Sequence, residues 1–497
     1  MSETSSLPRC HQYIFSVAVL LVIIVKVLCV WFYGPMTMGD NADFINAAKE
    51  ILANNQWLSD AKLNSTVFPP TLWRPIGYSM IIAGMITLFG ENWSVALCAL
   101  QALLSLLAGV MLYRLCMRAK MSVLAASAVF LLYQWSVPLS TDVLIMEDAL
   151  TGVIGMTSFM VLLFPVVQNQ IPSTKAFLLV GLMAAIAFLI RDVYHFAMPV
   201  LGLITLAVMT RLCRLKVGLM AAVALVLPVL LMATLLQGWN TYRTGSAVTT
   251  TSGQTAYLYA VLRAAQYDPG IIAGDDAFLR VARKENINFD YEDTRRINKK
   301  LFKDHAMNSI EQARIASQLF WGTLFSNPLP MIKAAMARTR IIQQGLLFTG
   351  PVSRLDDLHW WSGDALAETF YSTGWRAQAR EFRETLNPSS LTPEIIFHLG
   401  LRLLLRILGV AALMVFLIGA PWLWLRMRAQ LGGIAHAAAM CWGVYILWVC
   451  MYIPVSFEVR YLSPLIGPAL MTLAIVLANI GQLSTNVWFN KYNPPKY

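Results

Sequence analysis

Charged side chains are scarce in this chain of 497 residues: they make up 13% of it, whereas hydrophobic residues make up 57%. Soluble globular proteins carry about a quarter charged residues, so the composition excludes that class. The apolar residues also lack the alternation of a membrane β-strand and run for about 20 residues at a time, the length of a membrane-crossing helix. The sequence therefore predicts an all-α polytopic membrane protein.

Metal-binding and redox patterns are missing too. Six histidines occur without HxxxH or HxxE spacing, and seven cysteines occur without a CxxC pair. We therefore expect no dedicated zinc site and no disulfide. The net charge of +11 does not indicate a nucleic-acid partner, because the basic residues lie in short loops between apolar runs. One basic residue, Arg9, precedes the first run and no small-residue cleavage site follows it, which predicts an uncleaved first helix.

Ten apolar runs are candidates for transmembrane helices. They cover residues 13–33, 93–113, 121–139, 143–166, 174–190, 193–210, 217–237, 399–425, 434–454 and 461–482. The stretch 174–210 could instead be one bent helix, but that topology would place the basic residues that follow it on the outer side, so we prefer two helices.

The charges between the runs predict an orientation. If the N-terminus is cytoplasmic, the basic loop residues share the cytoplasmic face. These residues are Arg114, Arg118, Lys120, Arg211, Arg214, Lys216, Arg426, Arg428, Lys491 and Lys496. This orientation predicts an integral membrane protein with its functional site on the outer side, which in a bacterial inner (cytoplasmic) membrane is the periplasmic or exterior side.

Three parts are expected along the chain. Residues 1–237 form an N-terminal transmembrane module whose first outer loop covers 34–92. Residues 238–398 hold most of the polar residues and predict a small, mostly helical extracytoplasmic domain. Residues 399–497 form the C-terminal transmembrane helices.

Interfacial helices are expected on the outer side. Phe44, Ala47, Ala48 and Ile51 fall on one face of a helix that should lie along the membrane surface. After Tyr78, the apolar stretch IIAGMITLFG is too short to cross about 30 Å of hydrocarbon. The stretch NPLPMIKAAMARTRIIQQGLLF predicts an amphipathic helix started by proline, and its basic residues, Lys333, Arg338 and Arg340, should face lipid headgroups.

Carboxylates at the outer ends of spans are candidates for chemistry, because a charge at membrane depth costs a few kcal/mol. Asp40 lies at the outer end of the first run, and a role as a helix N-cap is its alternative. Glu147 opens a later run, beside apolar residues that make an unpaired carboxylate expensive. Capping is the expected role of the neighbouring Asp142 and Asp148, and Asp43 should be solvated.

Arginines on the same face are candidates for binding phosphate. Arg74 precedes Pro75, which should hold its backbone extended and let the guanidinium project into a cleft. Arg191 and Arg460 lie at outer helix ends. The planar guanidinium suits phosphate better than a lysine ammonium does, and snorkelling to lipid headgroups is the alternative.

Six stretches in order resemble the motifs of one enzyme family. They are GDNADFINAAKEIL, RPIGYSMIIAGMITLFG, the Ile145–Glu147 segment, the Leu189–Asp192 segment, WNTYRTGSAVTTTSGQTAYLY and EVRYLSPLIGP. Together they resemble the GT-C superfamily of membrane glycosyltransferases, in the branch of protein O-mannosyltransferases and lipid A aminoarabinose transferases. The chain departs from the family pattern at Asn41, Phe44 and Ile76, where the family often has glutamate, tyrosine and proline.

The resemblance implies an inverting glycosyltransferase of cell-envelope glycan biosynthesis. Such enzymes move a sugar from a polyprenyl monophosphate carrier to a hydroxyl of a glycan, lipid or protein, and a divalent cation is left open as a cofactor. Asp40 would be the general base and Glu147 would orient the sugar or acceptor. The donor phosphate and sugar would be held by a set of arginines and tyrosines, namely Arg74, Tyr78, Arg191, Arg243, Arg460 and Tyr461.

Two other classes stay open. A lipid or sugar transporter, or a flippase, is also rich in helices and intramembrane charge, although such proteins commonly show internal repeats and none is visible here. A polymerase or ligase of oligosaccharide-lipids would share the donor chemistry but use a diphosphate carrier.

Overall fold

The computed structural model describes residues 9–33, 35, 41–54, 67–136, 138–192, 194–272, 277–284, 291–338, 393–452 and 462–492. Helices dominate these ranges, and no β-strand occurs within them. The helices are α1 (Arg9–Tyr33), α2 (Asn41–Asn54), α3 (Pro70–Trp73), α4 (Ile76–Phe89), α5 (Trp93–Arg118), α6 (Val123–Ser136), α7 (Pro138–Thr141), α8 (Glu147–Val167), α9 (Thr174–Ile190), α10 (Tyr194–Leu212), α11 (Leu215–Thr244), α12 (Gly253–Ala265), α13 (Ala277–Lys284), α14 (Tyr291–His305), α15 (Ser309–Ser326), α16 (Pro328–Arg338), α21 (Pro393–Leu431), α22 (Gly433–Tyr452) and α23 (Ser463–Tyr492).

Long apolar helices make the chain an all-α membrane protein. Within the described ranges, six helical stretches are long and apolar enough to cross a membrane: α1, the run through α4 and α5, α8, α11, α21 and α22. The helices α6, α9, α10 and α23 contain shorter apolar stretches. The ten apolar runs of the sequence fall on these helices, and the number of crossings stays a prediction.

The prediction of two helices over 174–210 is confirmed, since α9 ends at Ile190 and α10 begins at Tyr194. Arg191 caps the end of α9 with φ −150° and ψ 123°, an extended conformation that stops the helix. The helix α10 then begins at Tyr194 and leads back toward the basic loop before α11.

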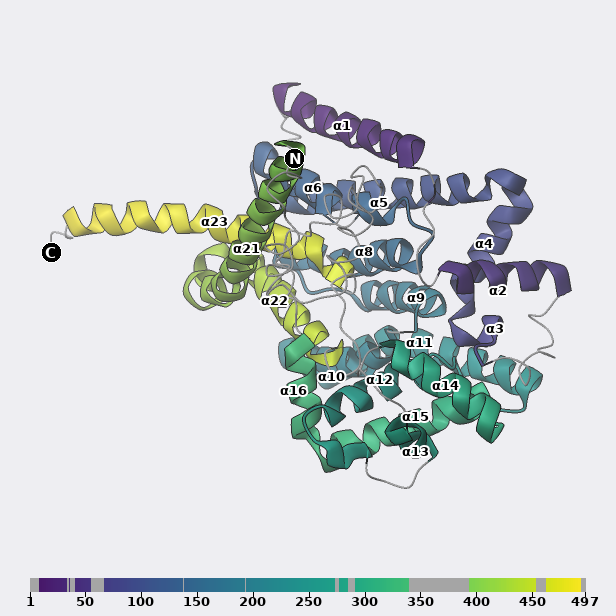
Figure 1. Ribbon diagram of the computed structural model, residues 1–497. Helices are drawn as coiled ribbons and strands as arrows, with labels where there is room; N and C mark the ends of the chain where they lie inside the picture. Colours follow the sequence, from purple (N-terminus) through teal and green to yellow (C-terminus); the bar gives the residue numbers. More distant parts are fainter. Residues whose placement is uncertain are drawn as a thin grey trace.

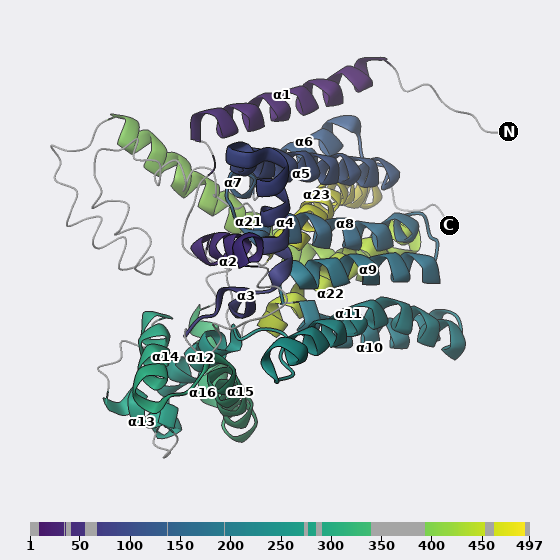
Figure 2. The same ribbon diagram turned by 90° about the vertical axis from the view of Figure 1, so that its right-hand side faces the viewer.

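The spans pack as a stack of helices, with α5, α8, α9 and α11 in that order in Figures 1 and 2. Contact between α9 and α11 is close at Gly181, where an added Cβ would lie only 2.5 Å from the backbone oxygen of Ala224. Small residues allow this approach, which helix packing in lipid favours. The helices α22 and α23 pack against α8, and the three share one buried apolar core with α5, α9 and α11.

Two of the basic loops lie at the end of the bundle opposite Arg191. At this end the Arg118 guanidinium stacks over the Phe164 ring at 4.9 Å, near the last turn of α8. Asn169, just beyond α8, accepts a hydrogen bond from the backbone N–H of Gly433 at the start of α22. The turn after the basic end of α21 therefore lies here too, so two of the basic loops share one end of the bundle. The side of the membrane that this end faces stays a prediction.

The short helices α2, α3 and α4 gather at the other end of the stack (Figure 1). The predicted face of α2 is confirmed, since Phe44, Ala47 and Ala48 are buried and Ile51 is half-buried. That face packs against α4, with the Phe44 and Tyr78 rings edge to face at 5.2 Å. The helix α4 has 14 residues, in keeping with the prediction that this segment is too short to span.

The helices α12 to α16 form a second group, at the lower left of Figure 2 on the side of α2 and α3. Its apolar residues build two small clusters around α12. Residues 291–326 form α14 and α15, which are separated where Asn308 caps α15 in a capping box with Glu311. As predicted, α16 starts with a proline, Pro328. The group is helical, as expected for part of the region 238–398.

Candidate functional site

Two carboxylates and one arginine meet where α8 begins and α9 ends. Glu147 and Asp148 form the first turn of α8, where the helix dipole favours negative charge, and Arg191 follows the last residue of α9. The Arg191 Nη1 atom forms an ion pair with Asp148 Oδ1 and lies 3.7 Å from Glu147 Oε1. All three side chains are less than 10% exposed. The sequence candidates Glu147 and Arg191 are therefore neighbours in the structure.

Glu147 is the less engaged of the two carboxylates. Its Oε1 atom is too far from Arg191 for a hydrogen bond, and its buried Oε2 atom has no hydrogen-bond partner among the described residues. A buried acceptor without a partner costs about 1–3 kcal/mol, and more when charged, so an arrangement of this kind needs a reason. Glu147 therefore has a buried acceptor atom that no described residue uses.

Asp148 has a role different from the capping that its sequence position suggested. The residue at the N-cap of α8 is Met146, which makes no side-chain cap. Asp148 instead neutralises Arg191, because a buried guanidinium is expensive unless it is paired. The capping prediction for Asp148 used only its position near a helix start, and the ion pair with Arg191 shows that it is wrong.

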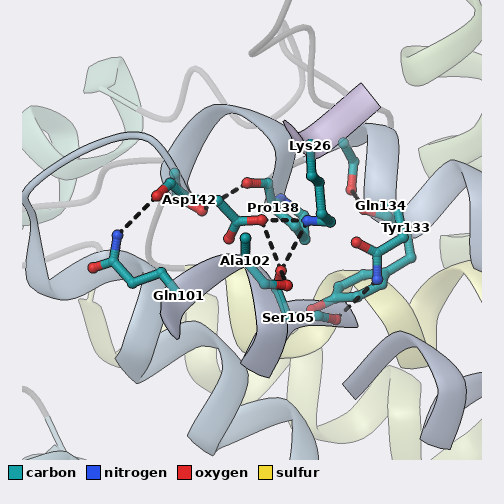
Figure 3. Close-up of polar contacts among 10 residues, drawn as sticks. Lys26, Gln101, Ala102, Ser105, Tyr133, Gln134, Pro138 and Asp142 are labelled. Carbon is teal, nitrogen blue, oxygen red and sulfur yellow. Dashed lines mark hydrogen bonds and ion pairs between the residues drawn. The ribbon is translucent and has the colours of Figure 1, made fainter. Parts of the chain in front are cut away.

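Asp142 also makes an ion pair, with Lys26 of α1. Figure 3 shows Lys26, Ser105 and Asp142 converging, with Ser105 Oγ 2.9 Å from Lys26 Nζ and 2.7 Å from Asp142 Oδ2. Burial raises the pKa of the Asp142 carboxyl, and the ammonium of Lys26 and the hydroxyl of Ser105 oppose that rise. The sequence analysis did not identify Lys26 as a candidate. Its position as a lone lysine inside the apolar run 13–33 would have indicated it.

Gln101 joins Tyr78 to the segment before Glu147. The amide nitrogen Nε2 of Gln101 donates to the backbone oxygens of Asp142 (3.0 Å) and Leu144 (2.9 Å). Its Oε1 atom accepts the hydroxyl of Tyr78 at 3.0 Å. The Tyr78 hydroxyl is thus used within the protein, and its predicted role in binding substrate stays a prediction.

Two of the candidate arginines, Arg74 and Arg243, lie among the described residues outside the α8–α9 corner and make different contacts. Arg74 is half-buried, with φ −119° and ψ 160°, and this extended backbone confirms the effect expected of Pro75. Its guanidinium lies 5.4 Å from the centroid of the Trp73 ring. Arg243 donates to the side chain (3.1 Å) and the backbone oxygen (2.8 Å) of Thr71. It therefore clamps the end of α11 to α3, and the phosphate-binding role predicted for it stays untested.

The threonine-rich segment after α11 is fastened to the same corner. Thr250 and Ser252 each donate to Asp192 Oδ2 at 2.8 Å. The backbone N–H of Thr251 donates to the Leu72 oxygen at 2.9 Å. Burial first, and then the Asp192 carboxylate, raise the pKa of Tyr257 on α12. These contacts bring α12 and its group next to α3 and the end of α9.

Residues from separate motifs meet in one apolar cluster under this corner. Phe44, Tyr78, Ile145 and Ile190 each come from a different stretch of the family-like pattern, and all four are buried together. Ser463 of α23 lies within the stretch EVRYLSPLIGP. It is so close to Gly152 of α8 that a Cβ added to that glycine would be 2.6 Å from the Ser463 hydroxyl. Stretches far apart in sequence therefore converge at one end of the bundle.

The remaining sequence candidates, Asp40, Arg460 and Tyr461, lie outside the described residues. Within the described ranges, no group of three or more histidine, cysteine, aspartate or glutamate side chains is placed to hold a metal ion. Comparisons with protein-family models, with curated proteins and with solved structures found no match to this chain.

Proposed function

We propose that the protein is an inverting membrane glycosyltransferase that moves a sugar from a polyprenyl monophosphate carrier to an acceptor hydroxyl. The observation that carries the proposal is the corner of Glu147 and Arg191. There a buried carboxylate oxygen without a partner among the described residues lies beside a buried cation, at the end of the bundle away from two of the basic loops.

Glycosyl transfer needs both a carboxylate and a cation. The acceptor hydroxyl must be oriented and deprotonated as it attacks the anomeric carbon, and a positioned carboxylate contributes about 10²- to 10⁴-fold as a general base. As the glycosidic bond breaks, the carrier phosphate gains negative charge, so fixed arginines stabilise the transition state more than the ground state.

The roles follow from the contacts. Glu147 has an acceptor atom, Oε2, without a partner among the described residues, and we assign it to a hydroxyl of the sugar or acceptor. Arg191 keeps a positive charge at the corner while Asp148 prevents an unpaired cation. Asp40 remains the candidate base, and Arg460 and Arg74 the candidate phosphate ligands, on the resemblance described above.

Orientation supports the same proposal. The corner lies opposite the basic loops, so a cytoplasmic basic face would place it on the exterior of an inner membrane. Nucleotide sugars are absent there, and a lipid carrier is the sugar donor that such a site can use.

The test compares surface glycans of cells with the protein, without it, and with Glu147→Gln in its place. Mass analysis should show one sugar missing from an envelope glycan, lipid or protein in cells that lack the protein or carry the variant. Identical glycans in all three strains would contradict the proposal. Accumulation of a complete lipid-linked sugar inside the cell, with no sugar transfer by the purified protein, would favour a flippase instead.

A further inference from the structure

A buried lysine, Lys26, lies in α1, far in sequence from the corner of Glu147. Lys26 is the one charged residue between Tyr13 and Trp31, and it is 6% exposed. Its neighbours Val27 and Leu28 are 59% and 44% exposed, so the face of α1 that carries Lys26 is turned toward the bundle. Placing an unpaired lysine ammonium at this depth in a membrane costs several kcal/mol. Such charges are usually paired and functional, so the partner of Lys26 indicates its role.

The partner is the segment that leads into α8. Lys26 pairs with Asp142 Oδ2, and Ser105 bridges both groups at 2.9 and 2.7 Å (Figure 3). Gln101 holds the backbone of the same segment through the oxygens of Asp142 and Leu144. The side chain and the backbone of residues 142–144 are therefore fixed from two sides, and the chain enters α8 at Glu147 three residues later.

Docking of α1 does not need this ion pair. The ring of Phe15 stacks on Tyr113 at 3.6 Å and meets Phe130 edge to face at 5.4 Å. Ala18 and Val22 are buried in the same contact. An apolar side chain at position 26 would hold α1 as well, because a buried ion pair is often no more stabilising than an apolar substitute.

We propose that Lys26 is a positioning residue: through Asp142 it fixes the segment 142–146 and, with it, the carboxylate of Glu147. This inference rests on the glycosyl transfer proposed above for its effect on turnover. The ion pair sets where α8 begins, and a shift of about 1 Å at a reacting group can cost on the order of 10²-fold in rate.

The test uses the double variant Lys26→Met and Asp142→Asn in the full-length protein in lipid. It removes both charges together, so neither is left buried alone, and the amide introduced at position 142 still offers an oxygen to Ser105. The matched control is Gln134→Met, which removes another buried hydrogen bond of the same cluster, from Gln134 Nε2 to the backbone oxygen of Ser105 at 2.8 Å.

One readout does not depend on enzyme activity. Met146, 7% exposed, is replaced by cysteine, and alkylation of the introduced thiol by a small reagent is followed by peptide mass spectrometry. In the double variant the alkylation rate should rise by about 10-fold or more, because the free energy needed to open the segment 142–146 locally is lower. The rate should stay within about 2-fold in the Gln134→Met control, and the buried native Cys116 and Cys441 should keep their rates in both.

The second readout is sugar transfer. The double variant should lose about 10-fold or more in kcat with the donor KM within about 3-fold, whereas Gln134→Met should keep kcat within about 2-fold. An unchanged alkylation rate of the introduced thiol in the double variant, or a parallel rise at Cys116 and Cys441, would overturn the inference. A selective rise at the introduced thiol in a protein whose wild type transfers no sugar would keep the positioning role and refute the proposed function.

Discussion

Replacing the two carboxylates at the start of α8 one at a time should separate a structural partner from a functional one. Asp148 makes the close ion pair with Arg191, while Glu147 lies 3.7 Å from the same nitrogen. Asp148→Asn leaves a buried guanidinium without its main partner, which costs about 3–5 kcal/mol. For a protein of this size that loss lowers the melting temperature by on the order of 5 °C.

Glu147→Gln should behave differently. Asp148 still neutralises Arg191, and the loss of a second buried carboxylate also removes its desolvation cost. The melting temperature should therefore stay within about 2 °C of wild type. Sugar transfer should fall by about 10²-fold, because the amide cannot hold a substrate hydroxyl as the carboxylate does.

The assay is thermal unfolding in lipid or detergent, with glycosyl transfer measured on the same samples. The exposed Glu91, changed to Gln, is the matched control and should alter neither property. If Glu147→Gln lowers the melting temperature as much as Asp148→Asn, Glu147 is only a second partner of Arg191. Full transfer by Glu147→Gln would refute its role directly.

Three further outcomes are expected. A topology reporter fused after Tyr267 should be extracytoplasmic and one after Lys216 cytoplasmic, and the reverse at either point would remove the shared outer face. Arg460→Ala should strongly weaken use of the donor and Arg460→Lys should restore it only in part, since the bidentate fork is lost; wild-type activity in both would mean that Arg460 only snorkels. Asp40→Asn keeps a good N-cap, so a capping role predicts near-normal activity, whereas a general base predicts a loss of about 10²- to 10⁴-fold in turnover with donor binding retained.

Features that depend on local sequence were predictable. Apolar runs gave the positions of the long helices, and Pro75 gave the extended backbone of Arg74. The spacing of Phe44, Ala47 and Ala48 gave the buried face of α2. Each of these follows from a few neighbouring residues, so a single sequence contains the whole signal.

Pairings between distant residues were not predictable in the same way. Lys26 and Asp142 are 116 positions apart, and Arg191 and Asp148 are 43 apart. The free-energy cost of an unpaired charge at membrane depth shows that each of these side chains needs a partner. Which partner it has depends on how the helices pack. For this reason Asp142 and Asp148 were expected to cap helices, and the ion pairs that they make emerged only from the fold.

The most direct measurement of the central claim follows the fate of the sugar donor. Purified protein in lipid is given polyprenyl monophosphate, polyprenyl diphosphate and nucleotide forms of labelled sugars, together with an envelope extract as the source of acceptors. Our account predicts labelled acceptor and an equal amount of free polyprenyl monophosphate from the monophosphate donor alone. Transfer from the diphosphate or nucleotide form, or movement of the intact donor across the bilayer without cleavage of its glycosidic bond, would contradict it.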